Sequence, residues 1–293
     1  DLAKISEKLG LTEDTQKSQS FSMGPEEEMT FRIILETRYH MMGILAQDSG
    51  FSVFVDLPCG YTPRAIETAE HSSSYIGLDL PPVISEISGI ILPMISSEKQ
   101  SLVRFNPVDA TNGRSLEKAL EDVKENICIN TEGLLMYFSD AEIHSFLENI
   151  KKLLDIHGGC WITADPEIMP EHIRILSAIH PGDTNHDTDS ILNEKADVSV
   201  TTNSLMVRYG HEKEDVEKVK DILSEHGLKA ERIRIGSHIV ATKAFSLLTP
   251  EQGSAVLKAV EDIAFWKVVS AGLSENNAGA DQHFTIRKEY TDG

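Results

Sequence analysis

Short, almost continuous apolar segments alternate along the chain with longer segments in which apolar residues recur every three or four positions. The first pattern is typical of strands buried on both faces, and the second of helices with one buried face. The predicted strands are residues 51–57, 75–80, 102–108, 127–131 and 160–164. The predicted helices are residues 25–50, 63–71, 83–95, 116–123 and 141–156.

Strands that alternate with amphipathic helices predict an α/β fold with a doubly wound, mostly parallel, Rossmann-like sheet. Helices would then cover both faces of the sheet. Ligands of such folds bind outside the carboxyl ends of the strands, where the strand order reverses. The residues that directly follow each strand are therefore the first candidates for a binding site.

The C-terminal third has a less regular pattern. Residues 198–208 predict a strand or hairpin and residues 213–225 a helix. Further strands are predicted at 232–235, 238–242 and 284–290. A helix that opens at Thr249 would carry an apolar face as far as Val268, which could serve a homodimer, although a place in the core fits it better.

Charge and cysteine content narrow the class of protein. The 293 residues include 27 Lys and Arg against 47 Asp and Glu, a net charge of −20. This charge repels nucleic acid and anionic membrane surfaces, so neither is expected as a partner. No apolar segment approaches the roughly 20 residues of a membrane-spanning helix, and no signal pattern precedes residue 24. Three cysteines without paired spacing (Cys59, Cys128 and Cys160) favour reduced thiols in a cytoplasmic protein.

Acidic residues stand at the ends of three successive predicted strands. Asp56 ends the first strand, and Asp79 ends the second, 79 − 56 = 23 positions later. Asp109 and Ala110 follow the third strand. A carboxylate at the second position can accept hydrogen bonds from a ribose diol, and one at the third can meet an adenine amino group. These positions indicate a cofactor that contains a nucleoside.

The loop after the first strand indicates which cofactor. A dinucleotide site needs three glycines so that a pyrophosphate can rest on the following helix. Residues 58–63 contain only Gly60, preceded by Pro58 and Cys59, which disfavours a nicotinamide oxidoreductase. S-Adenosylmethionine has no phosphate and needs only a loop whose backbone can approach the methionine part closely.

Several motifs resemble one family. Residues 56–65, followed by the segment 75–81, resemble class I S-adenosylmethionine-dependent methyltransferases. The run Glu-Gly-Leu-Leu-Met-Tyr at 132–137 resembles the leucine carboxyl methyltransferase group, which includes bacterial small-molecule O-methyltransferases. Thr37-Arg38 and Asp79-Leu80-Pro81 match two further motifs of this group. The resemblance covers residues 29–166, about half of the chain.

The resemblance implies S-adenosylmethionine as cofactor and a role for each matched residue. Arg38 would pair with the cofactor carboxylate, Asp79 would hold the ribose, and Glu132 would lie near the sulfonium. The expected cofactor-binding residues are Arg38, Asp56, Pro58, Cys59, Gly60, Asp79, Leu80, Asp109, Ala110, Glu132 and Gly133. Glu132 and Tyr137 are the catalytic candidates. His180 and His186 are further candidates for a base if the acceptor is a hydroxyl.

The resemblance also suggests a domain division. Residues 1–50 would form an N-terminal helical segment or lid, and residues 51–293 a methyltransferase domain with an insertion around 166–230. Within that insertion, residues 180–189 are rich in His and Asp. We interpret them as a solvated loop and expect no metal.

The predicted function is an S-adenosylmethionine-dependent O-methyltransferase that acts on a carboxylate or hydroxyl of a small molecule. One alternative is carboxyl methylation of a protein C-terminus, which the acidic composition disfavours. A second alternative is a catalytically inactive, nucleoside-binding relative. Pro58 and Thr62 motivate it, because the family usually has Gly and Asp at these positions.

Overall fold

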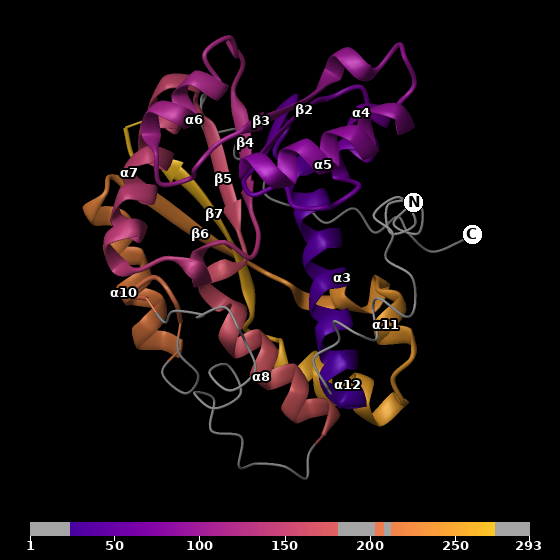
Figure 1. Ribbon diagram of the computed structural model, residues 1–293. Helices are drawn as coiled ribbons and strands as arrows, with labels where there is room; N and C mark the ends of the chain where they lie inside the picture. Colours follow the sequence, from indigo (N-terminus) through magenta and orange to yellow (C-terminus); the bar gives the residue numbers. More distant parts are fainter. Residues whose placement is uncertain (1–23, 181–202, 208–211, 273–293) are drawn as a thin grey trace.

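A seven-stranded sheet with helices on both faces forms the centre of the molecule (Figure 1). The computed structural model describes residues 24–180, 203–207 and 212–272. The strands are β1 (Val53–Asp56), β2 (Ser74–Asp79), β3 (Val103–Pro107), β4 (Ile127–Thr131), β5 (Gly159–Thr163), β6 (Leu228–Arg234) and β7 (Ala264–Ser270). Their order in the sheet is β3-β2-β1-β4-β5-β7-β6.

Strand order reverses between β1 and β4, which lie side by side in the sheet. β1 pairs in parallel with β2 on one side and with β4 on the other. Among the strands of the described residues, β7 alone runs antiparallel to its neighbours, β5 and β6. The predicted doubly wound, mostly parallel α/β fold is therefore confirmed, with one reversed strand inserted beside β5.

Eight helices of the described residues cover the two faces of the sheet. They are α3 (Pro25–Asp48), α4 (Arg64–Glu70), α5 (Pro81–Ile91), α6 (Gly113–Ala119), α7 (Asp140–His157), α8 (Ile168–Ile179), α10 (Glu212–Glu225) and α12 (Pro250–Ala259). Residues of α6, α7 and α10 share one core cluster with β1, β4 and β7. The opposite face is covered by α3, α8 and α12 over β4 and β5, and by α4 and α5 over β2 and β3.

Local signals explain where the two longest helices begin and end. The N–H of Gly24 donates to Glu27 at 3.0 Å, and Pro25 opens α3 at the first helical position. Ser139 and Glu142 form the predicted capping box of α7, and Gly158 ends that helix with a φ of +72°.

Two predictions for the C-terminal third were wrong. Residues 236–241 form a 3-10 helix, η5 (Gly236–Ala241), where a strand was predicted at 238–242. The helix predicted to run to Val268 ends at Ala259, and β7 follows it. Helix α8 was not predicted. A dense apolar segment fits a buried strand as well as a buried helix, so periodicity alone could not separate them.

The apolar face proposed for a homodimer lies in the core, where Val256, Val260, Phe265 and Val268 are at most 1% exposed. Residues 203–207 form a turn, and the other positions of the strand or hairpin predicted for 198–208 lie outside the described residues. The strand predicted at 284–290 also lies outside them.

Candidate active site

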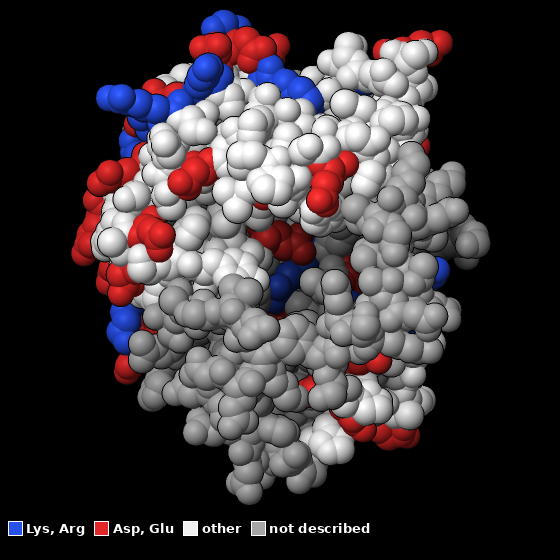
Figure 2. Space-filling model, viewed as in Figure 1, with Lys and Arg blue, Asp and Glu red and all other residues white. Residues whose placement is uncertain are grey.

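Charged side chains gather where the parallel strands end. Figure 2 shows a hollow near the middle of this view, with acidic and basic atoms on its floor.

Asp79 connects the end of β2 with the loop that follows β1. Its Oδ2 accepts a hydrogen bond of 2.9 Å from the N–H of Gly60, and its Oδ1 accepts one of 2.7 Å from Leu80. The N–H of Cys59 donates to the carbonyl of Leu78 at 3.0 Å. Gly60 has a φ of +50°, a conformation that favours glycine. Four predicted residues, Cys59, Gly60, Asp79 and Leu80, thus form one substructure.

The partly buried Pro58 precedes this substructure in the same loop. Burial raises the pKa of the Cys59 thiol, and the nearby carboxylates of Asp79 and Asp56 raise it further. Cys59 therefore remains a neutral thiol and is no candidate for a thiolate nucleophile.

Asp56 is enclosed by protein partners. Its Oδ2 accepts from Arg64 at 3.1 Å and from the Tyr75 hydroxyl at 2.9 Å, and its Oδ1 accepts from Asn130 at 3.1 Å. The side chain is 1% exposed. Its observed contacts give Asp56 a positioning role, and a direct contact with a cofactor stays a prediction.

Arg64 extends this contact to the end of β4. Its Nη2 donates to Glu132 at 3.2 Å, and its guanidinium carbon lies 4.9 Å from the centroid of the Tyr39 ring. Burial raises the pKa of Glu132, while Arg64 and then Arg38 oppose that shift. Glu132 keeps 20% of its side chain exposed, against 1% for Asp56 and 8% for Arg64.

A buried carboxylate shapes the turn after β4. Asp165 accepts hydrogen bonds from the N–H groups of Gly133, Leu134 and Leu135 at 2.7, 2.7 and 2.8 Å. Gly133 has a φ of +68°. Burial raises the pKa of Asp165, and the three backbone hydrogen bonds oppose that shift. Asp165 therefore fixes the backbone beside Glu132.

Arg38 lies at the same edge but its observed partner is a side chain. Its Nε and Nη2 donate to the Oε2 of Glu171 at 2.9 and 2.7 Å, which joins α3 to α8. The two side chains are 5% and 2% exposed. The contact with a cofactor carboxylate that the sequence suggested for Arg38 stays a prediction.

The other predicted residues make local contacts. The exposed Asp109 accepts from the N–H and hydroxyl of Thr111 at 2.9 and 2.7 Å. The carbonyl of Ala110 accepts from Asn149 at 3.1 Å. Tyr137 ends the short helix η3 (Leu135–Tyr137), with 48% of its surface exposed.

Two further candidates lie at the margin of what the structure describes. His180 is exposed, and its Nδ1 lies 3.8 Å from Glu26. His186 lies outside the described residues, as do residues 181–189 of the acidic loop. Among the residues that the structure describes, no three His, Cys, Asp or Glu side chains form a cluster suited to a metal ion. The described helices include none long and apolar enough to cross a membrane.

Sequence reasoning missed Glu171, and one signal could have found it. Glu171 occupies the same face of α8 as Ile168, Ile175 and Ile179. A charged residue among core-facing positions is seldom buried unless it is paired, so it predicts a buried partner. Nothing local identifies Arg38 as that partner, since it lies 133 positions earlier.

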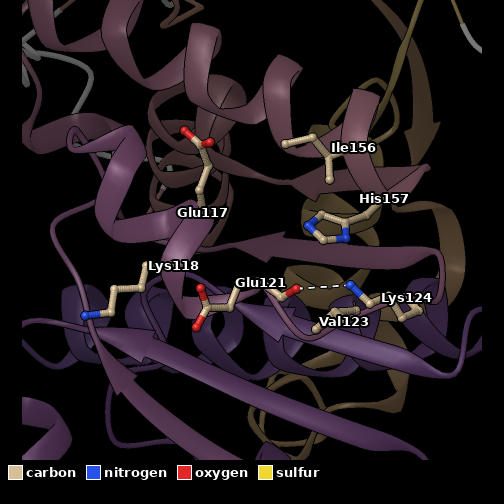
Figure 3. Close-up of a pocket in the computed structure, with 7 residues that line it drawn as sticks. All are labelled: Glu117, Lys118, Glu121, Val123, Lys124, Ile156 and His157. Carbon is tan, nitrogen blue, oxygen red and sulfur yellow. Dashed lines mark hydrogen bonds between the residues drawn. The ribbon is translucent and has the colours of Figure 1, made fainter.

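A cavity at the opposite edge of the sheet is separate from this site. It has a volume of about 500 Å³ and lies at the C-terminal ends of α6 and α7, where these helices lead into β4 and β5 (Figure 3). Its lining residues are Glu117, Lys118, Glu121, Val123, Lys124, Ile156 and His157. Lys124 donates to the carbonyl of Glu121 at 3.3 Å. None of the predicted site residues lines this cavity.

Comparison with known proteins finds similarity of structure only. No protein-family model matches the chain, and no curated protein sequence matches it. The methyltransferase domain of a bacterial Hen1 protein, CtHen1, is similar over 80% of this chain and 98% of its own, with 9% identity and a TM-score of 0.49. Human N-acetylserotonin methyltransferase is similar over 92% of this chain and 62% of its own, with 13% identity and a TM-score of 0.44.

Magnesium protoporphyrin IX methyltransferase from Synechocystis is also similar, over 79% of this chain and 90% of its own. Its identity is 12% and its TM-score 0.42. Values this low do not establish the activity of the present chain, which we infer below from its own residues.

Proposed function

We propose that this chain is an S-adenosylmethionine-dependent methyltransferase that binds its cofactor at the carboxyl ends of β1, β2 and β4. The observation that carries the proposal is the position of Asp79 at the end of β2, bound to the glycine of the β1 loop at 2.9 Å. A carboxylate at this position, beside the reversal of strand order, is suited to accept hydrogen bonds from a ribose diol.

The first loop supports a cofactor without phosphates. The N–H groups of Cys59 and Gly60 donate to Leu78 and Asp79, so they hold the loop to β2. A pyrophosphate site instead needs backbone N–H groups that point to the ligand. The N–H groups of Cys59 and Gly60 therefore already have protein partners, at the place where a dinucleotide site would present free N–H groups to the pyrophosphate.

Charge at the strand ends favours a cationic ligand. The buried or mostly buried acids at this edge include Asp56, Asp79, Glu132, Asp165 and Glu171. Two cations pair with three of them: Arg64 with Asp56 and Glu132, and Arg38 with Glu171. Burial raises the pKa of Glu132, Asp165 and Glu171, and the two arginines are fewer than the carboxylates around them. A sulfonium would be stabilised in such a field, and a dinucleotide pyrophosphate would be repelled.

The cofactor supplies a methyl group that its sulfonium already activates. The protein would hold it through residues of this chain: Arg38 at the amino-acid end, the Cys59–Gly60 backbone at the methionine chain, Asp79 at the ribose and Asp109 near the adenine. Glu132 would stabilise the positive charge. Alignment of the acceptor and exclusion of water then contribute most of the rate.

The acceptor that we propose is a small molecule with a carboxylate or hydroxyl group. A carboxylate needs no base, whereas a hydroxyl would need one, for which the exposed Tyr137 is the described candidate. Carboxyl methylation of a protein C-terminus, as in the leucine carboxyl methyltransferase group, is the alternative within this class. A cytoplasmic location is part of the proposal, and the three buried free cysteines support it.

One observation favours a second function, that of a non-catalytic nucleoside-binding protein. Arg38 and Asp79 both have protein partners, so a ligand would have to share or replace these contacts. Two measurements separate the alternatives. Thermal unfolding with S-adenosylmethionine, S-adenosylhomocysteine or NAD identifies the cofactor, and transfer of a labelled methyl group to a panel of carboxylates and phenols detects catalysis.

We expect S-adenosylmethionine and S-adenosylhomocysteine to raise the midpoint of unfolding and NAD to leave it unchanged. Protection by NAD alone would contradict the proposal. Cofactor binding without transfer to any acceptor would favour the non-catalytic function.

A further inference from the structure

Glu171 has an unusual environment for a buried carboxylate. The side chain is 2% exposed, and its Oε2 accepts both hydrogen bonds from Arg38. Its Oε1 is buried and, among the described residues, has no hydrogen-bond partner. The hydroxyl of Thr37, next to Arg38 in α3, is in the same situation. Buried polar atoms without partners are costly and rare, so they indicate a group that completes their hydrogen bonds.

The geometry of the pair differs from that of a purely structural clamp. Arginine and a carboxylate usually form two parallel hydrogen bonds that use both carboxylate oxygens. Here the Nε and Nη2 of Arg38 both donate to Oε2, at 2.9 and 2.7 Å, which leaves Oε1 unused. In contrast, Glu167 accepts from Arg232 through both oxygens, and also from Trp266 and Ala264.

The pair belongs electrostatically to the cluster at the strand ends. Burial raises the pKa of Glu171, Arg38 opposes this, and the charges of Glu132 and Glu167 add to the rise. Arg38 also lowers the pKa of Glu132 and of Asp165. A second cation beside Glu171 would therefore relieve repulsion among these acids.

We propose that Glu171 is a further binding residue for the cofactor: its Oε1 accepts a hydrogen bond from the α-ammonium group, beside Arg38, to which the family resemblance already assigns the α-carboxylate. This inference rests on the proposed function, because it assigns a partner to one end of the same cofactor. An α-amino acid presents a cation and an anion side by side. A buried Arg–Glu pair offers the complementary charges without adding net charge to the site.

The test compares ligands that differ only in this end of the molecule. S-Adenosylhomocysteine carries both charged groups, its decarboxylated analogue carries the amine alone, and 5′-methylthioadenosine carries neither. Calorimetric titration of the full chain measures the affinity for each. We expect the parent to bind S-adenosylhomocysteine at least tenfold more tightly than 5′-methylthioadenosine.

In Glu171→Gln the shape of the side chain is kept and its charge is removed. We expect a loss of tenfold or more for S-adenosylhomocysteine and for its decarboxylated analogue, with 5′-methylthioadenosine changed less than twofold. Glu70→Gln is the control for the loss of one carboxylate, because Glu70 is exposed at the end of α4 and lies outside this cluster. It should change the affinities for all three ligands by the same factor.

Two results would overturn the inference. One is an equal loss for S-adenosylhomocysteine and 5′-methylthioadenosine in Glu171→Gln, or no loss for either. The other is a parent that binds both ligands with equal affinity, a result that needs no variant and so decides the question even if Glu171→Gln does not fold. A folded parent that binds none of the three ligands would instead contradict the proposed function itself, and the inference with it.

Discussion

Arg64 Nη1 lies 3.1 Å from Asp56 Oδ2, and the same guanidinium donates to Glu132 at 3.2 Å. Asp56 ends β1 and Glu132 follows β4, so one cation joins the two strands at which the order of the sheet reverses. The Asp56 and Arg64 side chains are 1% and 8% exposed. The contact therefore fixes the strand ends that we propose as the binding edge.

Replacing Arg64 should destabilise the fold strongly. Arg64→Met leaves Asp56 and Glu132 without their shared cation, and removal of one partner from a buried pair typically costs about 3–5 kcal/mol. Arg64→Lys keeps a charge but loses the forked geometry, so an intermediate loss is expected. Denaturant unfolding measures both, with the exposed Arg114→Met as control. A loss below about 1 kcal/mol for Arg64→Met would show that this pairing does not hold the strand ends.

Gly77 allows a close contact beneath the β1 loop. A Cβ at this position of β2 would lie 2.5 Å from Phe105 Cδ1 and 3.2 Å from Cys59 Cβ. Gly77→Ala should therefore lower the free energy of unfolding by about 1–3 kcal/mol, the usual cost of overpacking. The double variant Gly77→Ala, Phe105→Leu should recover part of that loss.

Gly43→Ala is the matched control for this prediction. Gly43 lies within α3, and a Cβ there would meet no atom within 4 Å. Alanine should be neutral or stabilising by up to about 1 kcal/mol, because it lowers the conformational entropy of the unfolded chain. Equal effects at positions 77 and 43 would contradict the close contact with Phe105.

His172 predicts a loss of stability in acid. Burial lowers the pKa of His172 to about 4, Arg38 lowers it further, and Glu27 opposes the shift. Its ring lies 4.8 Å from that of Phe31. Because the folded pKa is below the unfolded value of 6.5, the contribution to stability is complete above pH 6.5 and is lost as pH falls through about 4.

The loss attributable to His172 should reach roughly 3 kcal/mol, at no more than about 1.4 kcal/mol per pH unit. Denaturant unfolding between these two pH values, for the parent and for His172→Gln, isolates it. The parent should lose more stability than the variant over this range, and the exposed His71→Gln should behave like the parent. Parallel curves for the parent and His172→Gln would show that His172 is not buried in its neutral form.

Cofactor binding should release protons in mild acid. The pKa values of Glu132 and Glu171 are raised above 4.5, chiefly by burial. A cationic ligand stabilises their ionised forms, so affinity should rise with pH across the interval between 4.5 and the raised values. Calorimetry with S-adenosylmethionine at about pH 5, in buffers of different ionisation enthalpy, counts the protons.

Glu132→Gln should release fewer protons than the parent, since it lacks one of the two titrating groups. Proton uptake by the parent, or release that Glu132→Gln leaves unchanged, would contradict a cation at this edge.

The central sheet could be predicted from the sequence because β1, β2, β4 and β5 are buried along almost their whole length and have mostly apolar segments. The division of the segment 249–270 could not, because the apolar positions Val256, Val260 and Ile263 continue the helical spacing across the short turn at 260–263 and into the strand. Residues 264–270 form a strand because they pair with both β5 and β6. No local sequence pattern encodes this pairing.

Some residues of the candidate site could likewise be predicted from the sequence, and others could not. Asp56, Asp79 and Glu132 could be placed because parallel strands bring their carboxyl ends to one edge. Their partners could not, since Glu171 reaches Arg38 across 133 positions and Asp165 reaches Gly133 across 32. Such contacts depend on how helices pack on the sheet, which the spacing of residues does not show.

The most direct test of the account is calorimetric titration of the parent and of Asp79→Asn with S-adenosylhomocysteine. The exposed Asp48→Asn serves as control. We predict micromolar binding by the parent and by Asp48→Asn, and binding weaker by tenfold or more, about 1.4 kcal/mol, in Asp79→Asn. Absence of binding by the folded parent, or equal affinity in Asp79→Asn, would contradict a cofactor held at the end of β2.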